Sequence, residues 1–142
     1  MGLDGALLAI ALGLGPHPSP APSPEGMWQT RDDRTGAARA LVRVSVRDAR
    51  LVGVIERLFL RPGEDAQPAC GLCRGDRRGQ PILGMEILRS HRQEGDRWTD
   101  GSVLDPETGK EYSSKVWLEG PDRLKVRGYW GPFHRTQTWW RQ

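Results

Sequence analysis

The sequence predicts a single-domain, all-β protein, an antiparallel up-and-down β-barrel of about eight strands. From Gly26 onward, apolar residues recur at every second position, which is the period of a half-buried strand. Short turns rich in Gly, Pro and Asp separate most of these segments. No helical segments alternate with them, which disfavours a parallel sheet. Closure of such an antiparallel sheet removes its exposed edges, so a barrel is the expected architecture.

Half of the strands are expected before residue 91. In the second strand, Ala40 and Val44 share one face and arginines occupy the other. A short turn leads from it into a more apolar third strand, so these two strands are expected to form a hairpin. The fourth segment also fits a helical turn, but Leu83, Met85 and Ile87 share one strand face, which favours a strand. These strands are expected near residues 26–31, 38–47, 50–60 and 83–90.

The second half of the chain repeats the alternation more regularly. The turn at Asp105–Gly109 has a physical cause, because Pro106 fixes its own φ and the final Gly ends the turn without steric strain. Gly-Pro breaks after Glu119 and after Trp130 separate the last strands. These strands are expected near residues 98–104, 111–118, 123–129 and 134–141.

The first 25 residues are expected to lie outside the barrel. Ala6–Gly15 is an apolar run with the length of a signal-peptide core, and it is too short for a membrane span, which needs roughly 20 residues. Proline at every second position from Pro16 to Pro24 indicates an extended linker. Asp4 stands where a signal peptide carries Lys or Arg, so an uncleaved tail is the alternative. The expected division is a signal peptide and Pro-rich linker in 1–25 and a barrel domain in 26–142, with no membrane-spanning segment.

Composition disfavours several classes of function. The formal net charge is +3, and cations alternate with acids along the chain, as in the segment Arg31–Arg34. Nucleic-acid-binding proteins usually cluster their cations, so a solvated mixed surface is expected and no nucleic-acid partner is predicted. The common nucleotide-binding and hydrolase motifs are missing from the sequence, and its acids gather at turns. No catalytic residue, metal site or cofactor is therefore predicted.

Cys70 and Cys73 are the only cysteines, at C-x-x-C spacing. In an oxidising compartment they are expected to form a local disulfide, which pins the connection around it and adds little stability because its loop is short. A redox-active pair is the second interpretation, with nearby arginines to lower a thiol pKa but no thioredoxin-type pattern around it. Zinc binding is the third, although a closed site needs four ligands and only His91 and His134 could supplement the thiolates.

Gly26-Met27-Trp28 opens the first strand and resembles the Gly-x-Trp motif of lipocalins. This resemblance implies that Trp28 packs across the closed end of a barrel, against an arginine of the last strand. Arg135 is the expected partner, with Arg141 as the alternative.

A longer set of strings, in order over about residues 26–142, resembles the bacterial domain-of-unknown-function 2147 family, whose members are exported and lipocalin-like. The strings are Leu51-Val52-Gly53 with Arg57-Leu58-Phe59, Cys70-Gly71-Leu72-Cys73, Gln80-Pro81-Ile82-Leu83-Gly84, Leu104-Asp105-Pro106 with Gly109-Lys110 and Tyr112, Leu124–Tyr129, and Arg135–Trp139. The resemblance implies a lipocalin-like barrel that is periplasmic or secreted, and it implies no activity.

The first functional hypothesis is a binding protein that holds a small, largely apolar or lipid-like molecule inside the barrel. An eight-stranded barrel is wide enough to hold one small ligand or to be filled by its own side chains. Tyr112, Arg127, Gln137 and Trp139 are the predicted ligand-binding residues. The alternatives are a filled barrel that acts as a structural or interaction module with a protein partner in the cell envelope, and a thiol-redox enzyme.

Overall fold

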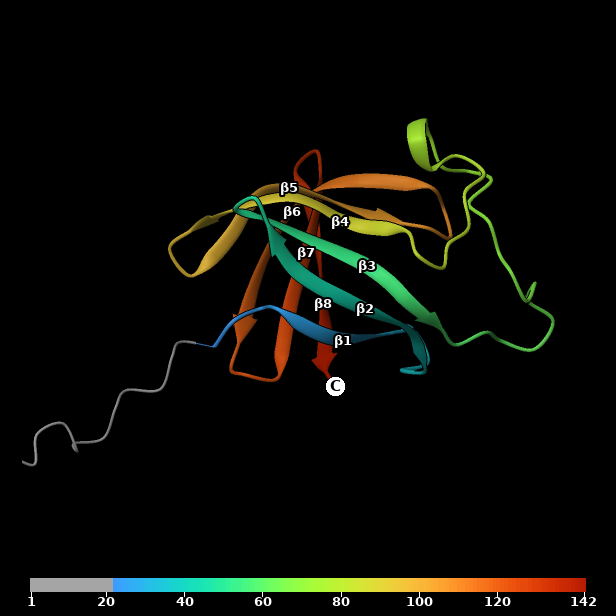
Figure 1. The fold of residues 1–142 in the computed structure, drawn as a ribbon, viewed down its shortest axis with the longest axis horizontal. Coiled ribbons are helices and arrows are strands. Elements are labelled where there is room, and N and C mark those ends of the chain that lie inside the picture. The colour runs from blue at the N-terminus through green and yellow to red at the C-terminus, as the bar shows by residue number, and fades with distance from the viewer. Residues whose placement is uncertain (1–21) are drawn as a thin grey trace, which may run out of the picture.

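The computed structural model describes residues 22–142, which form a closed antiparallel barrel in up-and-down order (Figure 1). Each strand pairs with its neighbours in sequence, and β8 pairs with β1 to close the sheet. The predicted fold class is therefore confirmed. The strands are β1 Gly26–Arg31, β2 Ala38–Arg47, β3 Arg50–Leu58, β4 Glu86–Glu94, β5 Arg97–Asp105, β6 Lys110–Glu119, β7 Arg123–Trp130 and β8 Phe133–Arg141, and a short 3-10 helix η1 spans Gly75–Arg77.

The fourth strand lies later in the chain than the periodicity predicts. Leu83 is 55% exposed and belongs to the β3–β4 connection. Within β4, Ser90 has a left-handed φ of 64° and forms a bulge, so that His91 pairs with Leu51 and Leu88 pairs with Gly53. Because a bulge adds one residue to the strand, His91 returns to the inner face on which Leu88 lies. This insertion interrupts the period-two pattern and explains the displaced prediction.

The core fills the half of the barrel in which β1 begins and β8 ends. The inward side chains there have at most 2% of their surface accessible to water, so they touch no water-sized void and the interior is packed solid. They are Trp28, Val42, Val44, Leu51, Leu88, His91, Val116, Leu124 and Trp139.

Arg141 closes this end of the barrel. Its guanidinium lies 4.3 Å from the centre of the Trp28 ring, and the Trp28 indole N–H donates to the carbonyl of Pro24 at 2.8 Å. Arg135, the expected partner of Trp28, lies instead toward the opposite end of β8 and forms an ion pair with Asp33. Positions 135 and 141 share a strand face, so alternation alone does not separate them. The Arg141 guanidinium also donates to the carbonyls of Ser23, Glu25 and Pro121.

The opposite, open end carries the longer loops. It comprises the β1–β2 loop, the β5–β6 and β7–β8 turns, and the long β3–β4 connection, which leaves the barrel at the right of Figure 1. Within the described residues, no helix has the length and apolar character needed to cross a membrane.

Candidate functional site

The inward side chains become more accessible toward the open end. Val126 on β7 is still buried, whereas Leu58, Val103 and Tyr112 are only partly buried. Gly128 lies between them, since a Cβ added there would be 3.3 Å from Cβ of Tyr112 and 3.4 Å from Cγ1 of Val103. Because position 128 carries no side chain, Tyr112 and Val103 pack directly against the buried backbone of Gly128.

β8 contributes a chain of polar contacts to this end. The buried Trp139 donates its indole N–H to Oε1 of Gln137 at 3.3 Å, and Nε2 of Gln137 donates to the Asp33 carboxylate at 3.1 Å. Asp33 also forms the ion pair with Arg135. The β1–β8 pairing extends over only two residue positions, near the closed end. The Asp33 contacts therefore join the β1–β2 loop to β8 where the strand ladder has ended.

The structure separates the predicted ligand-binding residues into two groups. Tyr112, Gln137 and Trp139 lie on the inner faces of β6 and β8. Arg127 does not join them, because it lies between two inward positions of β7 and faces outside. Its guanidinium is 4.9 Å from the centre of the Trp117 ring on the outer surface. The prediction for Arg127 as a residue of the barrel interior is therefore wrong.

An ion-pair network crosses the open end. Arg39 on β2 pairs with Glu64 of the β3–β4 connection at 3.1 Å and with Glu107 of the β5–β6 turn at 2.7 Å. Since β3 and β4 separate β2 from β5 along the wall, the contact with Glu107 passes over the opening. Arg61 adds ion pairs with Asp32 and Glu107. The Arg39 guanidinium, by hydrogen bonding, holds the pKa of the Glu64 carboxyl below its usual value.

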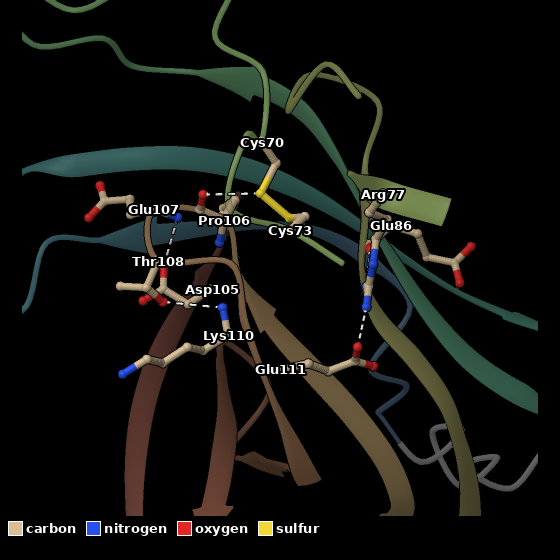
Figure 2. The surroundings of a disulfide bond; sticks show 10 residues. All are labelled: Cys70, Cys73, Arg77, Glu86, Asp105, Pro106, Glu107, Thr108, Lys110 and Glu111. Carbon is tan, nitrogen blue, oxygen red and sulfur yellow. Dashed lines mark hydrogen bonds and ion pairs between the residues drawn. A yellow bond between two sulfur atoms is a disulfide. The ribbon is translucent and has the colours of Figure 1, made fainter. Parts of the chain in front are cut away.

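The C-x-x-C pair lies outside the barrel, in the β3–β4 connection (Figure 2). Cys70 and Cys73 are joined by a disulfide, and the two residues are only 1% and 3% exposed. Sγ of Cys70 lies 3.5 Å from the carbonyl oxygen of Pro106, so the connection packs against the β5–β6 turn. Sulfurs covered in this way offer no surface to a thiol substrate.

Arg77 anchors the same connection to the barrel wall (Figure 2). Its buried guanidinium donates to the carbonyl of Glu86 at 2.9 Å and pairs with the Glu111 carboxylate. A surface hollow of about 390 Å³ lies beside Arg77, and another of about 290 Å³ lies beside Lys115 and Tyr129. Both hollows are on the outside of the barrel.

Sequence reasoning missed a buried polar pair in the barrel interior. His91 is 0% exposed, and neither of its ring nitrogens makes a well-formed hydrogen bond. The hydroxyl of Ser114, also buried, has none either. Ser114 pairs with Gly101, where an added Cβ would lie 2.2 Å from the His91 ring. Burial outweighs an opposing interaction with the Leu51 backbone and lowers the pKa of His91 from 6.5 to about 4, so the imidazole is neutral near pH 7.

The zinc interpretation of the cysteines finds no ligand set here. Residues 22–142 contain no group of three or more His, Cys, Asp or Glu side chains arranged to hold a metal ion. His91 lies inside the barrel and the disulfide lies outside it.

A comparison with models of protein families identifies the family of this chain. The model of the family described as "Uncharacterized protein conserved in bacteria (DUF2147)" matches residues 26–141. The chain belongs to this family. The match runs through every strand of the DUF2147 barrel and confirms the resemblance predicted from its sequence strings. No curated protein matches the sequence.

A solved structure supports the lipocalin-like fold of this DUF2147 chain. Protein HP1028 from the human pathogen Helicobacter pylori, described as a member of the lipocalin family, aligns with a TM-score of 0.71. The alignment covers 85% of this chain and 84% of that chain, with 17% sequence identity. At this identity, the likeness shows the fold and not a shared ligand.

Proposed function

We propose that the protein is an exported carrier that holds the apolar part of a small, lipid-like molecule in the open half of its barrel. One observation carries the proposal. The inward side chains are closely packed as far as Trp139 and become partly exposed beyond it, at Leu58, Val103 and Tyr112. An apolar group that enters this half leaves water for an apolar surface, which contributes about 25 cal/mol per Å² buried.

Polar groups at the rim of this half suit the polar end of such a ligand. Gln137 presents an amide, and the Arg135 side chain is 59% exposed in its pair with Asp33. A carbonyl, hydroxyl or carboxylate oxygen of the ligand would replace the Asp33 carboxylate as the acceptor for these two donors. The network of Arg39, Glu64 and Glu107 lies over the opening and would have to part for entry.

Export is part of the same proposal. The Cys70–Cys73 disulfide supports it, because such bonds persist in oxidising compartments. The expected signal-peptide core, Ala6–Gly15, lies outside the described residues.

Titration with the neutral apolar fluorophore N-phenyl-1-naphthylamine tests the carrier proposal. Wild-type protein is expected to bind the probe, and Gly128→Val is expected to weaken binding at least tenfold, because the added side chain would push Tyr112 and Val103 into the open half of the barrel. Arg127→Gln is the matched control, because it changes the adjacent residue on the outer face and should leave affinity unchanged. Gly128→Ala serves if the valine variant does not fold. Absence of wild-type binding, or equal effects of both substitutions, would contradict the proposal.

A filled-barrel interaction module is the second candidate. The solid packing of the closed half favours it, and so do Leu72 and Leu83, which are 68% and 55% exposed on the β3–β4 connection. It predicts no probe binding and a partner that crosslinks to this connection in the cell envelope.

A further inference from the structure

The outer face of β6 and β7 gathers cations that are scattered along the sequence. Buried valines occupy inward positions of these strands, so Lys115, Trp117, Lys125 and Arg127 face outside. Strand register places Lys115 directly opposite Arg127 and Trp117 directly opposite Lys125. Like charges in direct cross-strand contact destabilise a sheet. A bound anion would relieve the repulsion between Lys115 and Arg127, and the described part of the chain supplies no carboxylate partner to either side chain.

The carboxylates near this face already have cationic partners. Glu111 on β6 pairs with Arg77. Asp100, which lines the hollow beside Lys115 and Tyr129, pairs with Arg92. Glu119 pairs with Arg123 at 3.5 Å and with Lys125 at 3.7 Å. Within residues 22–142, Arg97, Lys115 and Arg127 take part in no ion pair, whereas Arg39, Arg77 and Arg89 do. The face therefore keeps a net positive charge after its internal pairs are counted.

Aromatic rings hold these cations in place. The guanidiniums of Arg97 and Arg127 lie 4.4 Å and 4.9 Å from the centre of the Trp117 ring, and Nζ of Lys115 lies 5.8 Å from that of Tyr129. Because guanidiniums cover the indole, it is not free to stack on a nucleobase, the usual contact of single-stranded nucleic acid. The face presents fixed charges instead, and the hollow beside Lys115 and Tyr129 opens among them.

An exposed aromatic tip adjoins the cationic face. Trp130 and Phe133 flank the β7–β8 turn, are 46% and 62% exposed, and have ring centres 6.4 Å apart. Aromatic side chains beside Lys and Arg are typical of the membrane–water interface, where the rings lie at headgroup level and the cations meet phosphates.

We propose that this face docks on an anionic phospholipid surface. Arg97, Lys115 and Arg127 meet headgroup phosphates, while Trp130 and Phe133 enter the interfacial layer. Trp130 also contacts Tyr112 at the mouth of the barrel, with ring centres 5.7 Å apart. The three cations lie on the outer face, so their part in docking does not depend on what the interior holds.

Flotation of the full chain with lipid vesicles tests this inference. Vesicles of equal parts phosphatidylglycerol and phosphatidylcholine are expected to carry the protein at low salt, with binding that weakens as salt rises, and vesicles of phosphatidylcholine alone are not. The double variant K115Q/R127Q is expected to bind about thirtyfold more weakly, since each cation near an anionic surface contributes about 1 kcal/mol. Phe133→Ser is expected to weaken binding at every salt concentration.

The matched control is R47Q/R50Q, which removes a second directly opposed pair of cations, at the β2–β3 turn. All of these side chains are on the surface, so each variant should fold, with a circular dichroism spectrum that matches wild type. Equal loss in both double variants would show attraction to net charge alone and overturn the proposed face. Failure to bind anionic vesicles, equal binding to phosphatidylcholine, or preference for single-stranded DNA over vesicles would also overturn it.

Discussion

Acidification is expected to destabilise the barrel through His91. The imidazole is fully buried and neither ring nitrogen makes a well-formed hydrogen bond, so the folded state favours its neutral form. Burial lowers its pKa from 6.5 to about 4, while the unfolded chain keeps the ordinary value. The unfolded state therefore takes up the proton at higher pH than the folded state. Stability is lost as pH falls through this interval and levels off below about 4. At about 1.4 kcal/mol per pKa unit, the total loss is about 3 kcal/mol.

Urea unfolding, followed by tryptophan fluorescence at a series of pH values between neutrality and about pH 4, measures this loss. His91→Leu is the comparison protein, because it removes the titrating group and keeps an apolar side chain in the space. The variant is expected to be nearly insensitive to pH over the same interval and at least as stable as wild type near pH 7, since it removes unpartnered buried polar atoms.

Exposed carboxylates do not affect the difference between wild type and His91→Leu. The pKa of Asp32 is lowered by backbone hydrogen bonds from Thr35 and Arg34, and that of Glu64 by its bond to Arg39. Their contributions are lost only as pH falls through these lowered values, and they are the same in both proteins. A wild-type stability that does not change with pH, or the same slope in His91→Leu, would refute the reasoning.

Three further predictions concern packing and covalent constraint. Gly101→Ala is expected to destabilise the protein by about 3 kcal/mol in thermal denaturation, because its Cβ would meet the imidazole ring of His91. Gly71→Ala, at a position with open space, should leave stability unchanged. Equal effects of the two substitutions would contradict the packing account. Arg141→Gln is expected to lower the free energy of unfolding by about 2 kcal/mol, as carbonyl hydrogen bonds and the contact with the indole are lost, and an unchanged urea midpoint would count against it. Reduction of the Cys70–Cys73 disulfide is expected to cost about 2 kcal/mol or less and to leave the barrel folded by circular dichroism, because the closed loop is short.

The barrel was predictable because its signals are local. Alternation in β2, β6 and β7 and turn chemistry at Asp105–Gly109 act between neighbouring residues, and an up-and-down order follows from short connections. The bulges at Ser90 and Asp100 were not predictable, because both are non-glycine residues in the left-handed region, with φ of 64° and 58°. The bulge at Ser90 decides that His91 faces inside, a placement that alternation alone does not give.

The candidate site was predictable only in part. Alternation assigns residues to two faces, and the apolar face of β7, with Val126, places Arg127 on the other, outer face. Tyr112 and Gln137 lie inside, but their neighbours across the barrel depend on register and closure. The same holds for the pair of Lys115 and Arg127, which are distant in sequence and become adjacent only through the pairing of β6 with β7.

Native mass spectrometry of the protein, purified gently from the envelope fraction of its own host, tests the carrier proposal most directly. The account predicts a discrete non-covalent adduct that disappears on denaturation and diminishes in Gly128→Ala, with a mass that identifies the ligand class. A bare protein mass in wild type and variant alike would contradict the proposal and favour the filled-barrel interaction module.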